Sequence, residues 1–193
     1  MEWYSVIRAL RAIDRADIAL LVLDATEPFT AQDKHIAGYI QQAVKGIVLI
    51  ANKWDLVKDK NITEWSTSVS SQLKFMPYAP VLYTSAKLRQ GVDKVMPQAY
   101  QVYQERIKRL GTAAVNSVVR QAIAAHAPPR IDGRRLKIRY ATQAEVNPPT
   151  FVFFVNDTNV HFSYQRYLEN KLRQAFGFTG TPLRLIFKTG GES

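Results

Sequence analysis

The residues best suited to chemistry are Asn52-Lys53-Trp54-Asp55, which follow directly after the apolar run of residues 46–51. Such a run predicts a strand buried in a parallel sheet, and ligands bind beyond the carboxyl ends of these strands. A carboxylate at Asp55 can accept two parallel hydrogen bonds from a purine with N1–H and an exocyclic amine, as guanine has and adenine lacks. Because a buried carboxylate left unpaired is unfavourable, this geometry discriminates between the two purines. Asn52 can bond a base acceptor or brace a neighbouring loop, and the Lys53 stem can cover the ring or sugar.

A second candidate, Ser85-Ala86-Lys87, ends the next predicted strand, residues 80–84. A small residue here lets a backbone N–H approach a ligand oxygen closely. In a parallel sheet with sequential strand order the two loops are adjacent, so we expect them to converge on one pocket. Either motif alone is a modest signal, whereas both at the ends of successive strands argue against a chance match.

Alternating elements position these loops in the first part of the chain. Residues 3–13 have helical apolar spacing, and strands are predicted at 18–24, 46–51 and 80–84. Helices are predicted at 30–44, 62–75 and 91–109, with Thr30 and Thr63 as candidate N-caps. This order implies right-handed crossovers and a parallel α/β sheet.

The pattern changes after Gly111. We expect a helix capped by Thr112 and stopped by Pro128-Pro129, and then a half-buried strand over residues 135–140. On that strand Leu136, Ile138 and Tyr140 share the apolar face. A turn at 147–149, a strand at 151–155, a helix at 160–176 and a strand at 183–187 complete a small α+β domain. The sequence therefore predicts two domains, residues 1–110 and 111–193, with the boundary near 110–112.

The two motifs resemble those of a known family. Asn52-Lys53-Trp54-Asp55 resembles the NKxD guanine-specificity motif of translation-factor-related GTPases, and Ser85-Ala86-Lys87 resembles their SAK motif. Residues 2–13 resemble the helix after the second switch region of the Der (EngA) family, bacterial GTPases with two tandem G domains. Residues 134–188 resemble the family's C-terminal KH-like domain. The resemblance covers essentially the whole chain and implies a partial Ras-like P-loop GTPase sheet, its last three strands and their helices, followed by an α+β KH-like domain.

The same resemblance implies ligands and partners. It implies a cytoplasmic GTP-binding protein that acts in assembly of the large ribosomal subunit, with rRNA as a partner. GTP or GDP would be bound through Asn52, Lys53, Asp55, Ser85, Ala86 and Lys87.

The sequence also departs from the family's pattern. It lacks a glycine-rich loop ending in Lys-Ser/Thr, a Mg²⁺-binding hydroxyl, a switch threonine and a DxxG motif. We therefore expect guanine-reading loops without tight GTP binding, a Mg²⁺ site or GTP hydrolysis in this chain alone. We expect the chain to be a truncated gene product, with an exposed apolar edge at residues 18–24.

The charge distribution points to an anionic partner. The net charge is +10, and residues 111–193 carry 11 Lys and Arg against 5 Asp and Glu, whereas residues 1–110 carry 15 against 11. This denser excess suggests RNA, although a solvated basic face or one packed on the G domain explains it as well. The candidate RNA contacts are Arg134, Arg135, Lys137, Arg139, Arg166, Lys171 and Arg173.

One further motif has the letters of a GxxG RNA clamp, Gly177-Phe178-Thr179-Gly180. It lies between a helix and the last strand, not between two helices, so we interpret it as a helix C-cap and turn.

Several other classes of function are disfavoured. There is no cysteine for a disulfide or thiolate metal site, and His35, His126 and His161 show no ligand spacing. No apolar stretch is long enough to cross a membrane, and the N-terminus does not resemble a signal peptide. Two alternatives stay open: a stand-alone rRNA- or ribosome-binding module without nucleotide binding, and an inert fragment that folds only with a missing half.

Overall fold

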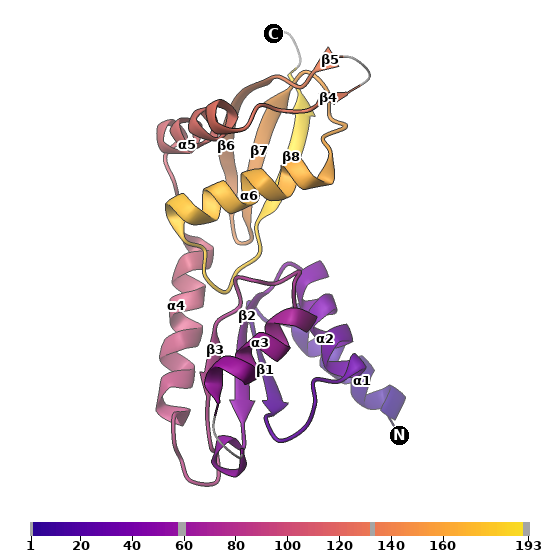
Figure 1. The fold of residues 1–193 in the computed structure, drawn as a ribbon, viewed down its shortest axis with the longest axis vertical. Coiled ribbons are helices and arrows are strands. Elements are labelled where there is room, and N and C mark those ends of the chain that lie inside the picture. Colours follow the sequence, from indigo (N-terminus) through magenta and orange to yellow (C-terminus); the bar gives the residue numbers. More distant parts are fainter. Residues whose placement is uncertain (1, 58–60, 132–133, 191–193) are drawn as a thin grey trace. The chain divides into compact units, whose positions relative to one another are not determined.

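The computed structural model describes residues 2–57, 61–131 and 134–190. The chain divides into two compact units (Figure 1). Unit 1 consists of Met1–Glu105 and Thr179–Pro182, and unit 2 of Arg106–Phe178 and Leu183–Ser193. The domain boundary near residues 110–112 stays a prediction from the sequence. Among the described residues, no helix is long and apolar enough to span a bilayer.

Unit 1 contains the predicted parallel sheet. Strands β1 (Ile18–Asp24), β2 (Gly46–Asn52) and β3 (Val81–Tyr83) lie in the order β1-β2-β3. β1 and β2 pair in register from Ile18↔Gly46 to Asp24↔Asn52. The first six residues of β2 are buried, as its unbroken apolar sequence predicts. The parallel α/β class is therefore confirmed.

The helices of unit 1 are α1 (Glu2–Arg15), α2 (Ala31–Gln42), α3 (Ile62–Gln72) and the part of α4 (Val95–Ile107) up to Glu105. Thr30 caps α2 as predicted, in a capping box in which the Asp33 side chain accepts a hydrogen bond from the Thr30 backbone. The predicted cap of α3 was wrong, because Asn61 and not Thr63 accepts from the Glu64 N–H. The backbone conformation of the preceding loop decides which of these residues caps the helix, and the spacing of apolar residues carries no information about that conformation.

Two apolar clusters sandwich this sheet. One buries residues from α1, α2, β1, β2 and α3 and includes Ile13, Leu21, Ile40, Leu49 and Val69. The other contains Val48, Ile50 and Val102. On β1, however, Leu20 and Val22 are 39% and 57% exposed. The expectation of apolar exposure along residues 18–24 is thus confirmed.

Unit 2 is an α+β arrangement. It contains α5 (Thr112–Ala125), a two-stranded hairpin of β4 (Arg130–Ile131) and β5 (Arg134–Arg135), and then β6 (Ile138–Val146), β7 (Pro149–Val155), α6 (Phe162–Phe176) and β8 (Arg184–Thr189). The larger sheet has the order β6-β7-β8, with β6 antiparallel and β8 parallel to β7. The predicted α+β class is confirmed.

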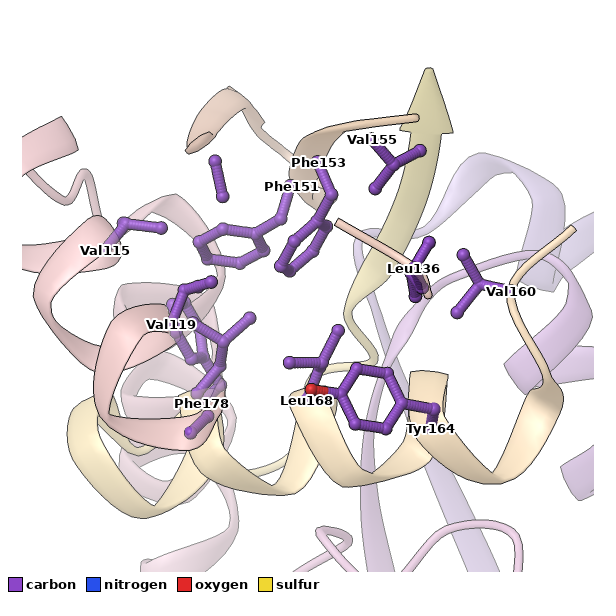
Figure 2. Packing of buried hydrophobic residues seen from close by; sticks show 13 residues of the cluster. Val115, Val119, Leu136, Phe151, Phe153, Val155, Val160, Tyr164, Leu168 and Phe178 are labelled. Carbon is purple, nitrogen blue, oxygen red and sulfur yellow. The ribbon is translucent and has the colours of Figure 1, made fainter. Parts of the chain in front are cut away.

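The core of unit 2 combines aromatic and aliphatic side chains and lies between its sheet and its helices. Phe151, Phe153 and Val155 from β7 meet Tyr164 and Leu168 from α6 (Figure 2). Phe151 and Phe153 are fully buried. Because successive strand residues point to opposite faces, β7 buries this odd-numbered set against the helices.

Two expectations for unit 2 were wrong in detail. The N-cap of α5 is Gly111, and the Thr112 hydroxyl lies 3.2 Å from that of Thr142 instead of capping the helix. The strand predicted over residues 135–140 is interrupted, and a register shift between Ile138 and Tyr140 turns the Tyr140 side chain away from the core. Tyr140 is consequently 46% exposed.

Two glycines, Gly177 and Gly180, bound the predicted turn after α6. Gly177 is the C-cap of that helix at φ +88°, which confirms the interpretation of residues 177–180 as a cap and turn. Gly180 lies in unit 1, where its carbonyl accepts from the Ile47 N–H at 2.7 Å and its N–H donates to the Tyr78 carbonyl at 2.8 Å. At φ +73°, a Cβ built on Gly180 would lie 2.3 Å from Val102 Cγ2.

Candidate functional site

The loops after β2 and β3 lie side by side at one edge of the sheet. β2 and β3 are parallel neighbours, paired from Leu49↔Val81 to Ala51↔Tyr83, so their carboxyl ends coincide. The Asn52 side-chain oxygen accepts hydrogen bonds from the Ala86 N–H at 3.0 Å and from the Thr84 hydroxyl at 3.2 Å. Asn52 therefore fastens the first loop to the second.

Asp55 lies in a short 3-10 turn, Trp54–Leu56, directly after this junction. Its Oδ1 atom is buried and has no hydrogen-bond partner among the described residues. A buried acceptor without a donor is unfavourable by about 1–3 kcal/mol, and by more when it is charged. The structure therefore contains one buried carboxylate oxygen that an external N–H donor would satisfy.

The Trp54 ring anchors this turn. It packs on Tyr83 of β3, with ring centroids 4.5 Å apart, and edge-on against Trp65 of α3 at 6.0 Å. The backbone N–H of Trp54 donates to the Thr84 carbonyl at 3.0 Å. Since ring and backbone are both held, the neighbouring Asp55 is presented from a fixed turn.

Lys53 makes an ion pair that the sequence analysis missed. Its backbone is left-handed, with φ 60°, and its ammonium lies 2.5 Å from the Asp24 carboxylate at the end of β1. The hydrogen bond from Lys53, aided by those from Thr26, lowers the pKa of Asp24 to about 2, and the same pairing raises the pKa of Lys53. The missed signal was the in-register alignment of Asp24 with Asn52.

The second loop is a tight turn. The Ser85 and Gln90 backbones exchange hydrogen bonds at 2.9 and 3.0 Å, and the Ser85 hydroxyl accepts from the Leu88 N–H at 3.1 Å. The Ala86 N–H is engaged by Asn52, so the next N–H, that of Lys87, is the one without a partner among the described residues. The Lys87 side chain is exposed.

The predicted basic candidates fall into distinct environments. Arg135, Lys137, Arg139 and Arg166 are exposed. The Lys171 ammonium lies 5.7 Å from the Tyr167 ring centroid, and the Arg173 guanidinium binds Glu169 at 2.8 Å and the Phe178 carbonyl at 2.9 Å. The Arg134 side chain lies outside the described residues. The described residues contain no cluster of metal-ligating side chains.

Known families match both units. Residues 4–105 match the elongation factor Tu GTP binding domain, and residues 109–188 match the KH-domain-like region of EngA bacterial GTPase enzymes, C-terminal. GTPase Der of Moorella thermoacetica is 52% identical over 194 residues, and that of Desulfitobacterium hafniense is 50% identical. The chain belongs to the EngA (GTPase Der) family. The predicted resemblance, including the GTPase-type sheet and the KH-like domain, is therefore confirmed.

The alignments with Der proteins cover nearly all of this chain but less than half of each relative. Both cover 99% of the chain and 44% of the relative. Era in complex with MgGDPNP and nucleotides 1506–1542 of 16S ribosomal RNA is a more distant solved structure, 19% identical, covering 94% of this chain and 68% of Era with a TM-score of 0.45. A likeness of that degree does not establish a common architecture.

Proposed function

We propose that the two loops of unit 1 read the guanine base of GTP or GDP. The observation that carries this proposal is the buried Asp55 Oδ1 without a partner, beside a loop that Asn52 ties to Ala86. An ionised carboxylate accepts only, so it fits the N1–H and 2-amino donors of guanine and not the acceptor N1 of adenine. The free Lys87 N–H supplies a donor for the guanine O6.

Binding of the base alone should be weak but selective. Charge-assisted hydrogen bonds contribute about 1.5–3 kcal/mol each, so two of them contribute about 3–6 kcal/mol. The entropic cost of association, about 4 kcal/mol or more, offsets most of this gain, so the affinity for the bare base should be millimolar or weaker. The sequence contains no glycine-rich loop ending in Lys-Ser/Thr. We therefore propose recognition of the base without hydrolysis of GTP by this chain alone.

Nucleosides test this proposal directly, because they lack phosphates. In an amide NMR titration, guanosine should shift the Asp55 and Lys87 signals, inosine should bind about tenfold more weakly because it lacks the 2-amino group, and adenosine should not compete. Asp55→Asn should lose guanosine and gain xanthosine, whose 2-oxo group accepts from the new amide. Asp93→Asn is the matched control, because Asp93 is an exposed aspartate in the other 3-10 turn, Val92–Lys94. Equal binding of guanosine and adenosine would refute the assignment.

We further propose that unit 2 contacts rRNA and that the protein acts in assembly of the large ribosomal subunit in the cytoplasm. The excess of positive charge in residues 111–193 and the exposure of Arg135, Lys137, Arg139 and Arg166 support the RNA contact. Arg173 contributes less, since its guanidinium is bound to Glu169 and Phe178. Co-sedimentation with large subunits should be salt-sensitive and should weaken in an Arg135→Gln, Lys137→Gln variant.

The alternative of an RNA-binding module without a nucleotide role makes a different prediction. Such a module would co-sediment with large subunits and show no shift with guanosine. The guanosine titration and the co-sedimentation together therefore decide between these functions.

A further inference from the structure

The face of the β6-β7-β8 sheet opposite to the core presents an aromatic pair. Tyr140 pairs with Phe154, and Phe154 pairs with Lys188, so these three side chains form one row across the sheet. The rings of Tyr140 and Phe154 are stacked, with centroids 4.2 Å apart and an interplanar angle of 15°. Tyr140 is nevertheless 46% exposed, and it belongs to β6, at one edge of the strand order.

Basic side chains surround this aromatic pair. Lys188 is next to Phe154, Arg184 lies two rows away on the same strand and face, and the Arg139 guanidinium lies beside Gly190 at the end of β8. All three cations are exposed, and none has a hydrogen bond or ion pair among the described residues. The one carboxylate of these rows, Glu145, is opposite Thr150 in the Arg184 row and lies away from the aromatic pair.

We propose that this face, formed by Tyr140, Phe154, Lys188, Arg184 and Arg139, binds single-stranded RNA. An exposed stacked pair provides a platform on which an unpaired base extends the stack from Tyr140, and nearby unpaired cations bind the adjoining phosphates. Positive charge around an aromatic surface complements a polyanion that carries bases and disfavours a basic or purely apolar partner. The site deepens the proposed RNA contact and lies apart from any GxxG clamp, since residues 177–180 are a helix cap and turn.

Matched variants of the full chain test the platform. Tyr140→Leu keeps apolar bulk and removes the stacking surface, and Phe162→Leu is the control, because Phe162 is 67% exposed on α6 and also lies near a cation, Arg166, at 5.8 Å. In fluorescence anisotropy with a short oligoadenylate RNA, Tyr140→Leu should weaken binding about 5- to 100-fold, whereas Phe162→Leu should change it less than twofold. An RNA duplex of equal length, whose bases are paired, should bind the Tyr140→Leu and Phe162→Leu variants with the same affinity.

The charges provide a second, independent readout. Replacing both Lys188 and Arg184 by glutamine should reduce the slope of log affinity against log salt by about 0.7 for each phosphate that the variant no longer neutralises. Circular dichroism and the melting temperature would establish that each variant is folded. If Tyr140→Leu and Phe162→Leu bind oligoadenylate equally well, the platform does not exist.

Other outcomes separate this inference from the function on which it rests. If Arg135→Gln with Lys137→Gln abolishes RNA binding while Tyr140→Leu leaves it unchanged, the rRNA contact stands and the platform is refuted. If Tyr140→Leu alters self-association instead of RNA affinity, the face is a protein interface and the inference is overturned.

Discussion

Replacing Gly180 by alanine tests the packing of the segment Thr179–Pro182 in unit 1. The new Cβ would lie 2.3 Å from Val102 Cγ2 and 3.0 Å from the Ile47 carbonyl oxygen. Val102 is fully buried and branched at Cβ, so it has little freedom to move. The backbone oxygen is fixed by the strand. Overpacking is destabilising by about 1–3 kcal/mol, and a non-glycine residue at φ +73° adds about 1–2 kcal/mol. Gly180→Ala should therefore lower the unfolding free energy of unit 1 by about 2–5 kcal/mol.

Urea unfolding followed by tryptophan fluorescence measures this change, because Trp3, Trp54 and Trp65 all lie in unit 1. With an m-value of about 2 kcal/mol/M, the midpoint should fall by roughly 1–2.5 M urea. Gly38→Ala is the control: a Cβ there meets no atom within 4 Å, and in helix α2 it should stabilise by about 0.5–1 kcal/mol.

A double variant separates the two contributions to this destabilisation. Val102→Ala removes the methyl groups that clash, so Gly180→Ala should be less damaging in that background than in the parent chain. If Gly180→Ala alone changes the unfolding free energy by less than about 0.5 kcal/mol, as an ordinary surface substitution does, then residue 180 is not packed as described.

Interactions within each unit lead to three further predictions. Asn52→Ala removes the acceptor of the Ala86 N–H and should destabilise unit 1 by about 1–3 kcal/mol in urea unfolding; an unchanged midpoint would contradict a tie between the loops. Asp24 has a folded pKa of about 2 against 3.8 when free, so its ion pair stabilises above pH 4 and is lost as pH falls towards 2. Its carboxyl carbon should titrate near pH 2 by NMR and nearer 3.8 in Lys53→Gln, and a parent midpoint at 3.8 would rule the pair out. Phe151→Ala opens a cavity in the unit 2 core and should be destabilising by about 3–5 kcal/mol by calorimetry; a change below about 1 kcal/mol would mean that the site is not packed.

Features written into a short stretch of sequence were predictable. The unbroken apolar runs identified β1 and β2, Thr30 identified the cap of α2, and residues 160–176 were predicted as the helix that the structure has as α6. In each case the cause is local, because helix and strand periodicities and capping boxes act within a few residues.

Features that depend on the partner strand were not predictable. Strict alternation placed Tyr140 in the core, but the register shift against β7 moves it to the open face. The pairing of Lys53 with Asp24 and the placement of Thr179–Pro182 in unit 1 likewise join residues distant in sequence. Of the candidate base site, the sequence identified the residues and the shared sheet edge. Only the structure shows that the Ala86 N–H donates to Asn52, whereas the Lys87 N–H has no partner among the described residues.

The bond from the Ala86 N–H to Asn52 has a consequence for how a ligand would be sorted. Since folding already orders both loops, a purine bound as proposed would lose little free energy to immobilising them, and its discrimination would not depend on a closing motion. The same fixed conformation of the two loops would then determine the relative affinities of weak and strong ligands. The ability to tell one base from another would reside in the folded chain itself and would persist even for a bare nucleoside whose residence is brief.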